Sequence, residues 1–168
     1  MNVLKYSKIN FYEKRIEKPI DNITMSEKIL FLSYEEHKAT IFYKAECDEE
    51  YKKRFNKNDL CVALLSSEIV NVSWITNQSI FIDEIETELQ NDGIIIYDVN
   101  TKPEKRGKGY YSKMLNLITN WAAMQGHNKI TIYSEAKNKS SIKGIIKAEF
   151  KYTKSICMFK AFKYKFYI

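Results

Sequence analysis

The sequence predicts an α+β fold, in which helices flank a central mixed β-sheet. Three observations support this fold class. The chain has 168 residues, which suits a single domain spanning residues 1–168. Apolar residues make up 45% and aromatic residues 14%, enough for a packed core and too much for a disordered chain. Strand-like and helix-like segments alternate through the second half, which is the pattern of a sheet covered by helices.

The first 60 residues give the weakest pattern. Residues 28–33 and 40–44 are rich in β-branched and aromatic side chains, and we expect a strand at each. Residues 46–57 are highly charged and contain neither glycine nor proline. Tyr51 and Phe55 lie four positions apart there, on one face of a helix. This region therefore predicts strands followed by a helix.

The middle of the chain reads as a series of strands separated by turns. The apolar segments are, in order, residues 60–65, 68–75, 79–85 and 94–100. Ser66 and Ser67 join the first two, so we expect an antiparallel hairpin. Asn91, Asp92 and Gly93 form a strong turn signal before the last of them.

The remaining elements alternate between helix and strand. Residues 110–124 carry apolar side chains at intervals of three and four, the spacing of an amphipathic helix, and Gly126 is placed to end it. We then expect a strand, a second helix and one or two closing strands, at residues 129–133, 138–148 and 150–168. The sequence contains no clear linker and no internal repeat.

The net charge of +6 conceals an uneven distribution. Residues 1–100 contain 12 Lys/Arg and 18 Asp/Glu, whereas residues 101–168 contain 15 and 3. A basic half of this kind attracts polyanions, such as nucleic acid, an anionic membrane surface or a phosphorylated cofactor. A lysine-rich surface in contact with water explains the same counts equally well.

Metal and disulfide sites are not expected. Cys47, Cys61 and Cys157 are odd in number and lack the spacing of a zinc site, and His37 and His127 are far apart. The N-terminus does not resemble a signal peptide, and no apolar run is long enough to span a membrane. We therefore expect a soluble, cytoplasmic protein with no metal ion and no membrane partner. The oligomeric state stays open, with a homodimer as one alternative.

A cluster of glycines marks a candidate anion site. The chain has only five glycines and two prolines, yet Gly107 and Gly109 stand together between a predicted strand and a predicted helix. Glycines let the backbone approach a ligand closely, and free N–H groups at a helix N-terminus attract anions. Arg106 and Lys108 add positive charge. The motif is neither a P-loop nor the dinucleotide-binding fingerprint, and an ordinary turn with solvated cations is the alternative.

Two elements of the sequence resemble the GNAT superfamily of acetyl-CoA-dependent acyltransferases. The family signature is a strand, a P-x-x-R-G-x-G loop and a long helix, matched here by Pro103, Arg106, Gly107 and Gly109. Downstream, Asn138 begins a match to the family's N-x-x-S element, and Glu149 and Phe150 stand at the place of its G-F pair. The resemblance covers residues 58–168 and leaves residues 1–57 as a variable acceptor-side region.

The resemblance implies a GNAT-like acyl-CoA N-acyltransferase fold, an acetyl-CoA donor and direct transfer of its acetyl group to an amine of a small molecule. Backbone groups of one strand would hold the pantetheine and the thioester, at Val99, Asn100 and Thr101. The amides that follow would hold the pyrophosphate, from Arg106, Gly107, Lys108, Gly109, Tyr110, Tyr111 and Ser112. Asn138 would contact the cofactor from the loop after the next strand.

Three residues depart from the family pattern. Tyr111 stands where the motif usually ends in glycine or alanine. Glu149 replaces the glycine of the G-F pair, in a turn whose positive φ suits glycine best. Many members have a tyrosine seven residues after the asparagine, which acts as the general acid toward the leaving thiolate. Ile145 stands there and cannot donate a proton.

The acceptor amine must lose a proton, so a general base or a water relay has to lie within hydrogen-bond reach of it. Asp98, Tyr133 and Glu135 are the candidates, because they stand near the ends of the two strands that the resemblance places beside the thioester. Each has a structural alternative: a loop cap for Asp98, sheet packing for Tyr133 and a surface carboxylate for Glu135. A backbone N–H would polarise the thioester carbonyl.

The overall match, especially in residues 95–109 and 141–150, resembles family members that are found with surface-polysaccharide enzymes, so an amino sugar is one expected acceptor. The alternative function is a non-catalytic module of the same fold that binds CoA or nucleic acid, consistent with Ile145 and Glu149. Lysines alternate with aromatic side chains in residues 159–167, a pattern that can stack on single-stranded nucleic acid. A strand with one apolar and one charged face shows the same alternation, and we favour it, so nucleic acid is not an expected partner.

Overall fold

A large mixed sheet dominates the structure, a computed structural model that describes residues 5–16, 28–161 and 164–168. The strands in these ranges are β1 (Lys5–Arg15), β2 (Lys28–Leu32), β3 (Leu60–Leu65), β4 (Ile69–Thr76), β5 (Ile80–Ile82), β6 (Thr87–Leu89), β7 (Ile94–Thr101), β8 (Lys129–Glu135), β9 (Lys151–Ala161) and β10 (Tyr164–Tyr167). The helices are α1 (Tyr34–Lys38), α2 (Asp48–Asn56), α3 (Tyr110–Met124) and α4 (Lys139–Lys147), with short 3₁₀ turns at Ala45–Cys47 and Pro103–Lys105.

Eight of these strands form the mixed sheet, in the order β10-β9-β1-β8-β7-β4-β3-β2. β7 and β8 are parallel and are connected through α3, while the other neighbours in the sheet are antiparallel. β5 and β6 form a separate hairpin. The parallel pair therefore lies in the middle of the sheet, with antiparallel strands on both sides.

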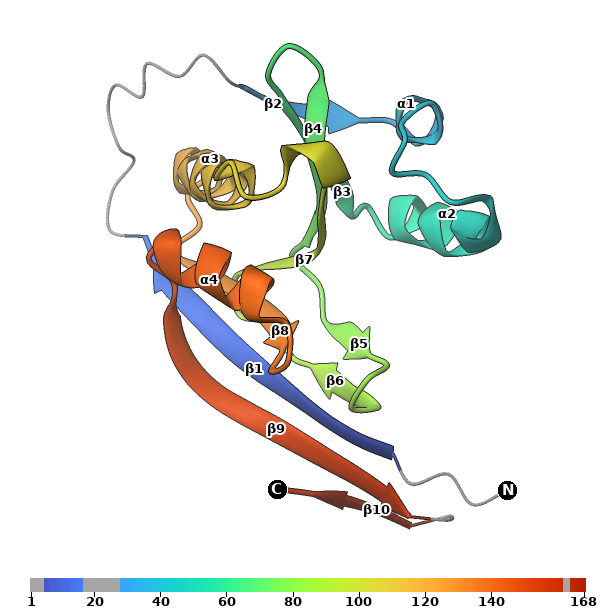
Figure 1. The fold of residues 1–168 in the computed structure, drawn as a ribbon, viewed down its shortest axis with the longest axis vertical. Helices are drawn as coiled ribbons and strands as arrows, with labels where there is room; N and C mark the ends of the chain where they lie inside the picture. The colour runs from blue at the N-terminus through green and yellow to red at the C-terminus, as the bar shows by residue number, and fades with distance from the viewer. Residues whose placement is uncertain (1–4, 17–27, 162–163) are drawn as a thin grey trace.

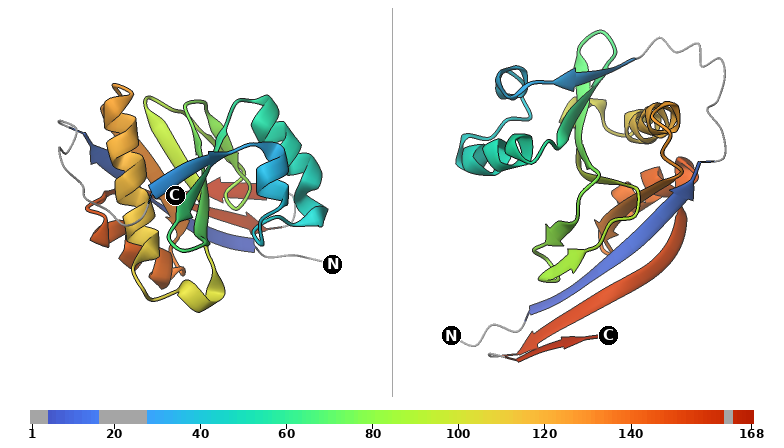
Figure 2. Two further views of the ribbon diagram at one scale, coloured as in Figure 1. Left: turned by 90° about the horizontal axis from the view of Figure 1, so that it is seen from above. Right: turned by 180° about the vertical axis from the view of Figure 1, so that it is seen from behind.

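Helices cover both faces of the sheet. α3 and α4 lie together on one face, and α1 and α2 lie on the other, as Figures 1 and 2 show. Alternation along β7 explains this arrangement, because successive side chains of a strand point to opposite faces. Ile94 and Ile96 pack with α3 and α4, whereas Tyr97 packs with the α2 side.

The second face has two separate covers. α2 packs over β3 and β4, where Tyr51 meets Trp74 in parallel stacking at 6.0 Å between ring centres. The β5–β6 hairpin covers β1 and β9 instead, and Ile82 lies there in one buried cluster with Ile9 and Met158. The carboxyl ends of β7 and β8 lie on this face between α2 and the β5–β6 hairpin.

The structure confirms the expected mixed sheet with helices, the hairpin of β3 and β4, and the unit formed by β7, α3 and β8. The expected strand at residues 40–44 is wrong. Thr40 Oγ1 donates to His37 O, and Phe42 N donates to Thr40 Oγ1, which closes a turn after α1. No pattern in residues 5–15 predicted β1, which lies in the sheet between β8 and β9.

Candidate active site

The parallel strands β7 and β8 separate at their carboxyl ends. They pair only at Ile94 with Ile130, at Ile95 with Thr131 and at Ile96 with Ile132. Beyond these pairs, β7 continues along β4 as far as Thr101, and β8 continues along β1 as far as Glu135. Backbone groups on the facing edges of the two strands therefore have no ladder partner there among the described residues. The candidate site lies in this opening.

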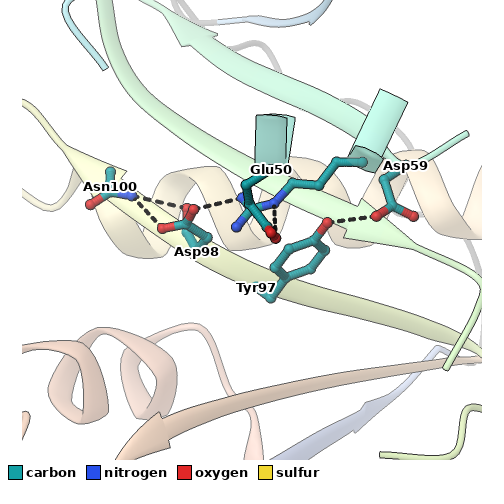
Figure 3. A network of polar contacts seen from close by, with 6 residues as sticks. Glu50, Asp59, Tyr97, Asp98 and Asn100 are labelled. Carbon is teal, nitrogen blue, oxygen red and sulfur yellow. Dashed lines mark hydrogen bonds and ion pairs between the residues drawn. The ribbon is translucent and has the colours of Figure 1, made fainter. Parts of the chain in front are cut away.

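A β-bulge shapes the β7 side of the opening. Between Tyr97 and Asn100, β7 contains one more residue than the part of β4 that it faces. Asp98 takes a φ of 49°, a left-handed conformation that is uncommon outside glycine. Its carboxylate accepts hydrogen bonds from Asn100 Nδ2 and from Arg54 Nη1, both at 2.7 Å (Figure 3). These two donors hold Asp98 in the bulge.

Arg54 of α2 lies among aromatic rings as well as carboxylates. Its guanidinium lies 5.1 Å from the ring centres of both Trp74 and Tyr97 and donates to Glu50 at 3.2 Å. Tyr97 in turn donates to the buried carboxylate of Asp59 at 2.7 Å, as Figure 3 shows. Burial raises the pKa of Tyr97, and the Asp59 carboxylate adds to the shift. These contacts bind α2 and the start of β3 to the bulged strand.

The loop between β7 and α3 borders a cavity of about 380 Å³, here called the small cavity. Gly107 and Gly109 both take a positive φ, 74° and 84°. No side chain of the described residues caps α3, whose N-cap is Gly109, so the first amide groups of this 15-residue helix keep their donors for another partner. A Cβ added at Gly109 would lie 3.7 Å from Lys147 Nζ, which places an ammonium group of α4 beside the loop.

Most of the predicted donor-site residues surround the small cavity. They are Val99, Asn100, Thr101, Arg106, Gly107, Gly109, Tyr110, Tyr111 and Asn138. Lys108 and Ser112 are not among its lining residues. Lys108 is exposed, and Ser112 is buried with its hydroxyl donating to Gly109 O at 3.0 Å. Arg106 Nε donates to Thr101 O at 3.2 Å, which fixes this side chain across the loop.

Asn138 has a structural role at the start of α4. Its Oδ1 accepts hydrogen bonds from Ser141 N at 3.1 Å and from Ser140 Oγ at 2.9 Å, as a helix N-cap does. Asn138 also lines both the small cavity and a larger one beside it. The cap therefore holds this residue at the junction of the two.

The larger neighbour, here called the large cavity, has a volume of about 650 Å³. It shares several lining residues with the small cavity, among them Val99, Tyr111 and Ser141. α2 and the β5–β6 hairpin supply much of its wall. Six carboxylate side chains and three basic ones line it, and Asp83 and Glu84 come from the turn between β5 and β6. This balance favours a cationic ligand over an anionic one.

All three predicted candidates for the general base line the large cavity. Asp98 is engaged by the two donors described above. Tyr133 packs against Phe11 with ring centres 6.2 Å apart, and burial raises its pKa, so it keeps its proton at neutral pH. Glu135 forms an ion pair at 2.7 Å with Lys137, whose side chain is exposed.

Two of the residues that depart from the GNAT family pattern, Ile145 and Glu149, lie in α4 and directly after it. Ile145 is fully buried in the core beneath α3, so this position offers no proton donor to either cavity. Glu149 takes a φ of 65°, the conformation in which glycine commonly follows a helix. Glu149 N donates to Ile146 O and Phe150 N to Ile145 O, the two bonds of a Schellman cap. The turn keeps this shape without the glycine.

Sequence reasoning missed what α2 contributes to the site. Arg54 reaches Asp98 across 44 positions, and Tyr97 reaches Asp59 across 38, so no local pattern shows that these residues meet. The available signal was the spacing of Tyr51 and Phe55, because it predicted the helix that carries Arg54.

Acidic residues of the first half neutralise part of the basic second half. Glu86 pairs with Lys160 at 3.0 Å and also with Lys165. These two lysines face each other across β9 and β10, and Phe159 faces Phe166 in the next register position. Because neighbouring positions point to opposite faces, the lysines lie on one face and the phenylalanines on the other. The tail thus has the arrangement of a strand pair with one charged and one apolar face.

The described residues contain neither a metal-binding cluster nor a membrane-spanning helix. No group of histidine, cysteine and acidic side chains there is arranged to hold a metal ion. No helix in those ranges is both long and apolar enough to cross a membrane.

Comparison with solved structures shows that the chain has the GNAT fold. An acetyltransferase of the GNAT family from Colwellia psychrerythraea matches with a TM-score of 0.61 at 15% identity, over 96% of this chain and 57% of that one. A GCN5-related N-acetyltransferase from Sphaerobacter thermophilus matches with a TM-score of 0.58 at 12% identity, over 94% and 53%. A conserved protein of unknown function from Staphylococcus epidermidis matches with a TM-score of 0.61 at 10% identity, over 93% and 62%.

The chain is shorter than the structures that it resembles and spans less than two thirds of each of these three. No protein-family model matches the sequence, and a search of curated proteins finds no relative.

Proposed function

We propose that this protein is an acyltransferase that moves an acetyl group from acetyl-CoA directly to an amine of a small-molecule acceptor. One observation carries the proposal. The opening between β7 and β8 joins a cavity bordered by backbone donors to a cavity in which carboxylates outnumber basic side chains. An anionic donor and a cationic acceptor would therefore approach the same point from two sides.

The small cavity fits the phosphates of the donor. A Cβ added at Gly107 would meet no described atom within 4 Å, so the loop is open on that side. The uncapped amides of Tyr110, Tyr111 and Ser112 begin α3, where the helix dipole favours an anion. Lys147 adds an ammonium group beside Gly109. These groups would bind the pyrophosphate.

The free edge of β7 would hold the pantetheine arm. Past Ile96, the β7 groups that face β8 have no ladder partner in the described part of the chain, and an extended amide chain can pair with such an edge as a further strand would. Val99 and Asn100 lie on this stretch and line both cavities. A β7 N–H would there polarise the thioester carbonyl and stabilise the oxyanion that forms on attack.

Glu135 is the candidate base that fits best. The amine must lose a proton as its nitrogen bonds to the acetyl carbon. Asp98 is already bound by Arg54 and Asn100. Tyr133 keeps its proton because burial raises its pKa. Glu135, at the end of β8, has an exposed lysine as its ion-pair partner, and such pairs are weak. Its carboxylate would take the proton directly or through one water.

Amino sugars are the acceptors to test first, together with other primary amines. An amino sugar is cationic at neutral pH, and the carboxylates of the large cavity suit that charge. The carboxylates of the turn between β5 and β6 act on the site electrostatically. Burial is the main cause of the raised pKa of Tyr133, and the negative charge of Glu84 is the second.

Two measurements test the proposal. Thermal-shift titration with CoA and acetyl-CoA measures donor binding, because a ligand that binds only the folded state raises Tm. Release of the CoA thiol across a panel of amines, amino sugars included, measures transfer. We expect stabilisation by both ligands and thiol release with at least one amine. No stabilisation at millimolar CoA would overturn the proposal. Binding without thiol release would favour a non-catalytic CoA-binding module.

A further inference from the structure

Tyr111 lies where the two cavities meet. It lines both of them, whereas Tyr110 lines the small cavity alone, and Tyr97 and Tyr133 line the large cavity alone. Among the described residues, it is therefore the one phenol shared by the donor side and the acceptor side. A group that acts on the bond between the donor and the transferred acetyl has to lie at this junction.

The ring of Tyr111 fills a hollow in α4. A Cβ added at Gly144 would lie 2.5 Å from Tyr111 Cδ1, closer than two unbonded carbon atoms can approach. A larger residue at position 144 would push the ring aside. The glycine of α4 and the tyrosine of α3 thus match in size, and this match sets the position of the ring. The next residue, Ile145, points into the core, so α4 brings no phenol of its own.

The hydroxyl of Tyr111 is held and keeps its proton. Tyr111 OH lies 2.7 Å from Ser141 Oγ, and either group can donate in this hydrogen bond. Burial raises the pKa of Tyr111 to about 12, so the phenol is neutral at physiological pH. If the tyrosine gives up its proton, Ser141 can donate to the phenolate oxygen that remains.

We propose that Tyr111 is a catalytic residue of the acyl transfer and donates its proton to the sulfur of the departing CoA. This inference rests on the proposed function. The amine nitrogen bonds to the acetyl carbon, and the carbon–sulfur bond breaks with its electron pair leaving on sulfur. Tyr111 protonates that sulfur and becomes a phenolate, which Ser141 stabilises. The proton lost by the amine returns to Tyr111 through Glu135 or solvent, so the products are an amide and the CoA thiol.

The variant Tyr111→Phe tests this role, because it keeps the ring in its hollow and removes only the hydroxyl. We expect kcat to fall by about 100-fold, as is typical when a general acid is lost. KM for acetyl-CoA should change by less than about threefold. The matched control is Tyr152→Phe, which removes an exposed hydroxyl on β9 outside both cavities and should leave kcat unchanged. Thermal unfolding of both variants checks that they are folded.

A binding experiment separates this chemistry from packing. CoA and desulfo-CoA, which lacks the sulfur atom, are titrated by calorimetry into wild-type protein and Tyr111→Phe. A hydroxyl that donates to the sulfur predicts about fivefold weaker binding of CoA by the variant and unchanged binding of desulfo-CoA. Equal losses for both ligands, or a kcat near that of the wild type, would overturn the role of Tyr111. Wild-type protein that binds neither ligand would instead overturn the proposed function, and this inference with it.

Discussion

Arg54 Nη1 lies 2.7 Å from Asp98 Oδ2, and this ion pair joins α2 to the bulge of β7. The side chain of Arg54 is only 16% exposed, whereas that of Asp98 is 38% exposed. Asp98 also holds the left-handed φ of 49°. A partly buried arginine of one element thus holds an unusual backbone conformation of another, at the wall of the large cavity.

Replacing Arg54 with methionine should destabilise the fold and loosen the bulge. Methionine keeps the apolar length of the side chain but loses the charge that lies over the rings of Trp74 and Tyr97. We expect the free energy of unfolding to fall by about 2 kcal/mol, from the lost hydrogen bonds and cation–π contacts. KM for the acceptor should rise more than KM for acetyl-CoA.

Urea unfolding and steady-state kinetics measure these two effects. Lys52→Met on the same helix is the matched control, because its ion pairs lie at the surface and contribute little. If Arg54→Met were no less stable than Lys52→Met, the pair with Asp98 would not hold the bulge.

Gly109→Ala should impair donor binding. Gly109 takes a φ of 84° and Gly126 a φ of 81°. Alanine is strained by about 1 kcal/mol in this conformation, so both variants should lose similar stability. Only at Gly109 does the new methyl group enter the proposed phosphate site, where it would approach Lys147 Nζ at 3.7 Å. We therefore expect CoA affinity, measured by calorimetry, to fall about tenfold in Gly109→Ala alone. Equal affinities for the two variants would place the phosphates elsewhere.

Lys147→Gln should weaken CoA binding through an electrostatic effect. We expect about a fivefold loss at low ionic strength and a smaller one at high salt, because Lys147 is exposed and salt screens such charges. Pantetheine, which has no phosphate, should bind the variant as it binds the wild type. Lys143→Gln is the control, since Lys143 is exposed on the same helix but, unlike Lys147, is not among the atoms within 4 Å of a Cβ added at Gly109. A loss that persists at high salt, or that extends to pantetheine, would argue against a phosphate contact.

The donor side of the site could be predicted from the sequence because its parts are close together along the chain. Gly107 and Gly109 act through the conformation of one loop, and the amides of α3 follow directly. Such features are decided within a few residues, by backbone sterics and by the unpaired groups at a helix end. The mixed sheet could be predicted for a related reason, since apolar periodicity marks β7, α3 and β8 one by one.

The acceptor side could not be predicted in this way. Arg54 and Asp98 are 44 positions apart in the sequence, and only the folded chain brings them into contact. The sequence did not predict β1, because Phe11 and Tyr12 are adjacent and both buried. The register of β1 with β9 shifts between these two residues, and this breaks the alternation of buried and exposed side chains that marks a strand. The strand predicted at residues 40–44 is wrong because Phe42 packs against the core from a turn, so its apolar side chain did not indicate a strand.

Glu149→Gly should stabilise the fold. A φ of 65° costs a residue other than glycine about 1 kcal/mol. Glycine removes this strain but loses the ion pair with Lys14, in which the Glu149 side chain is 82% exposed and the gain is therefore small. Glycine also makes the unfolded chain more flexible, so we expect a net gain of about 0.5 kcal/mol in the free energy of unfolding. Glu149→Ala loses the pair but keeps the strain, so it should be slightly less stable than the wild type. The prediction fails if urea unfolding ranks the glycine variant below the alanine variant.

His37 should make the stability of the fold depend on pH. The side chain is 1% exposed and lies among the rings of Tyr43, Tyr51 and Trp74. Neither ring nitrogen has a hydrogen-bond partner among the described residues. Burial lowers the pKa of His37, and the positive charge of Arg54 lowers it further. The folded state therefore keeps the imidazole neutral at a pH where the unfolded chain protonates it.

The free energy of unfolding should consequently decrease as the pH falls below about 6.5, the ordinary histidine pKa. Above that pH the residue is neutral in both states and adds no pH dependence. Below it the unfolded state binds more protons, and the slope from this one group reaches at most about 1.4 kcal/mol per pH unit. His37→Phe places a ring without a titrating group among the same aromatic neighbours. Between about pH 7 and about pH 5.5, its stability in urea unfolding should therefore fall less steeply than that of the wild type. Parallel curves for the two proteins would mean that His37 takes up no proton on unfolding.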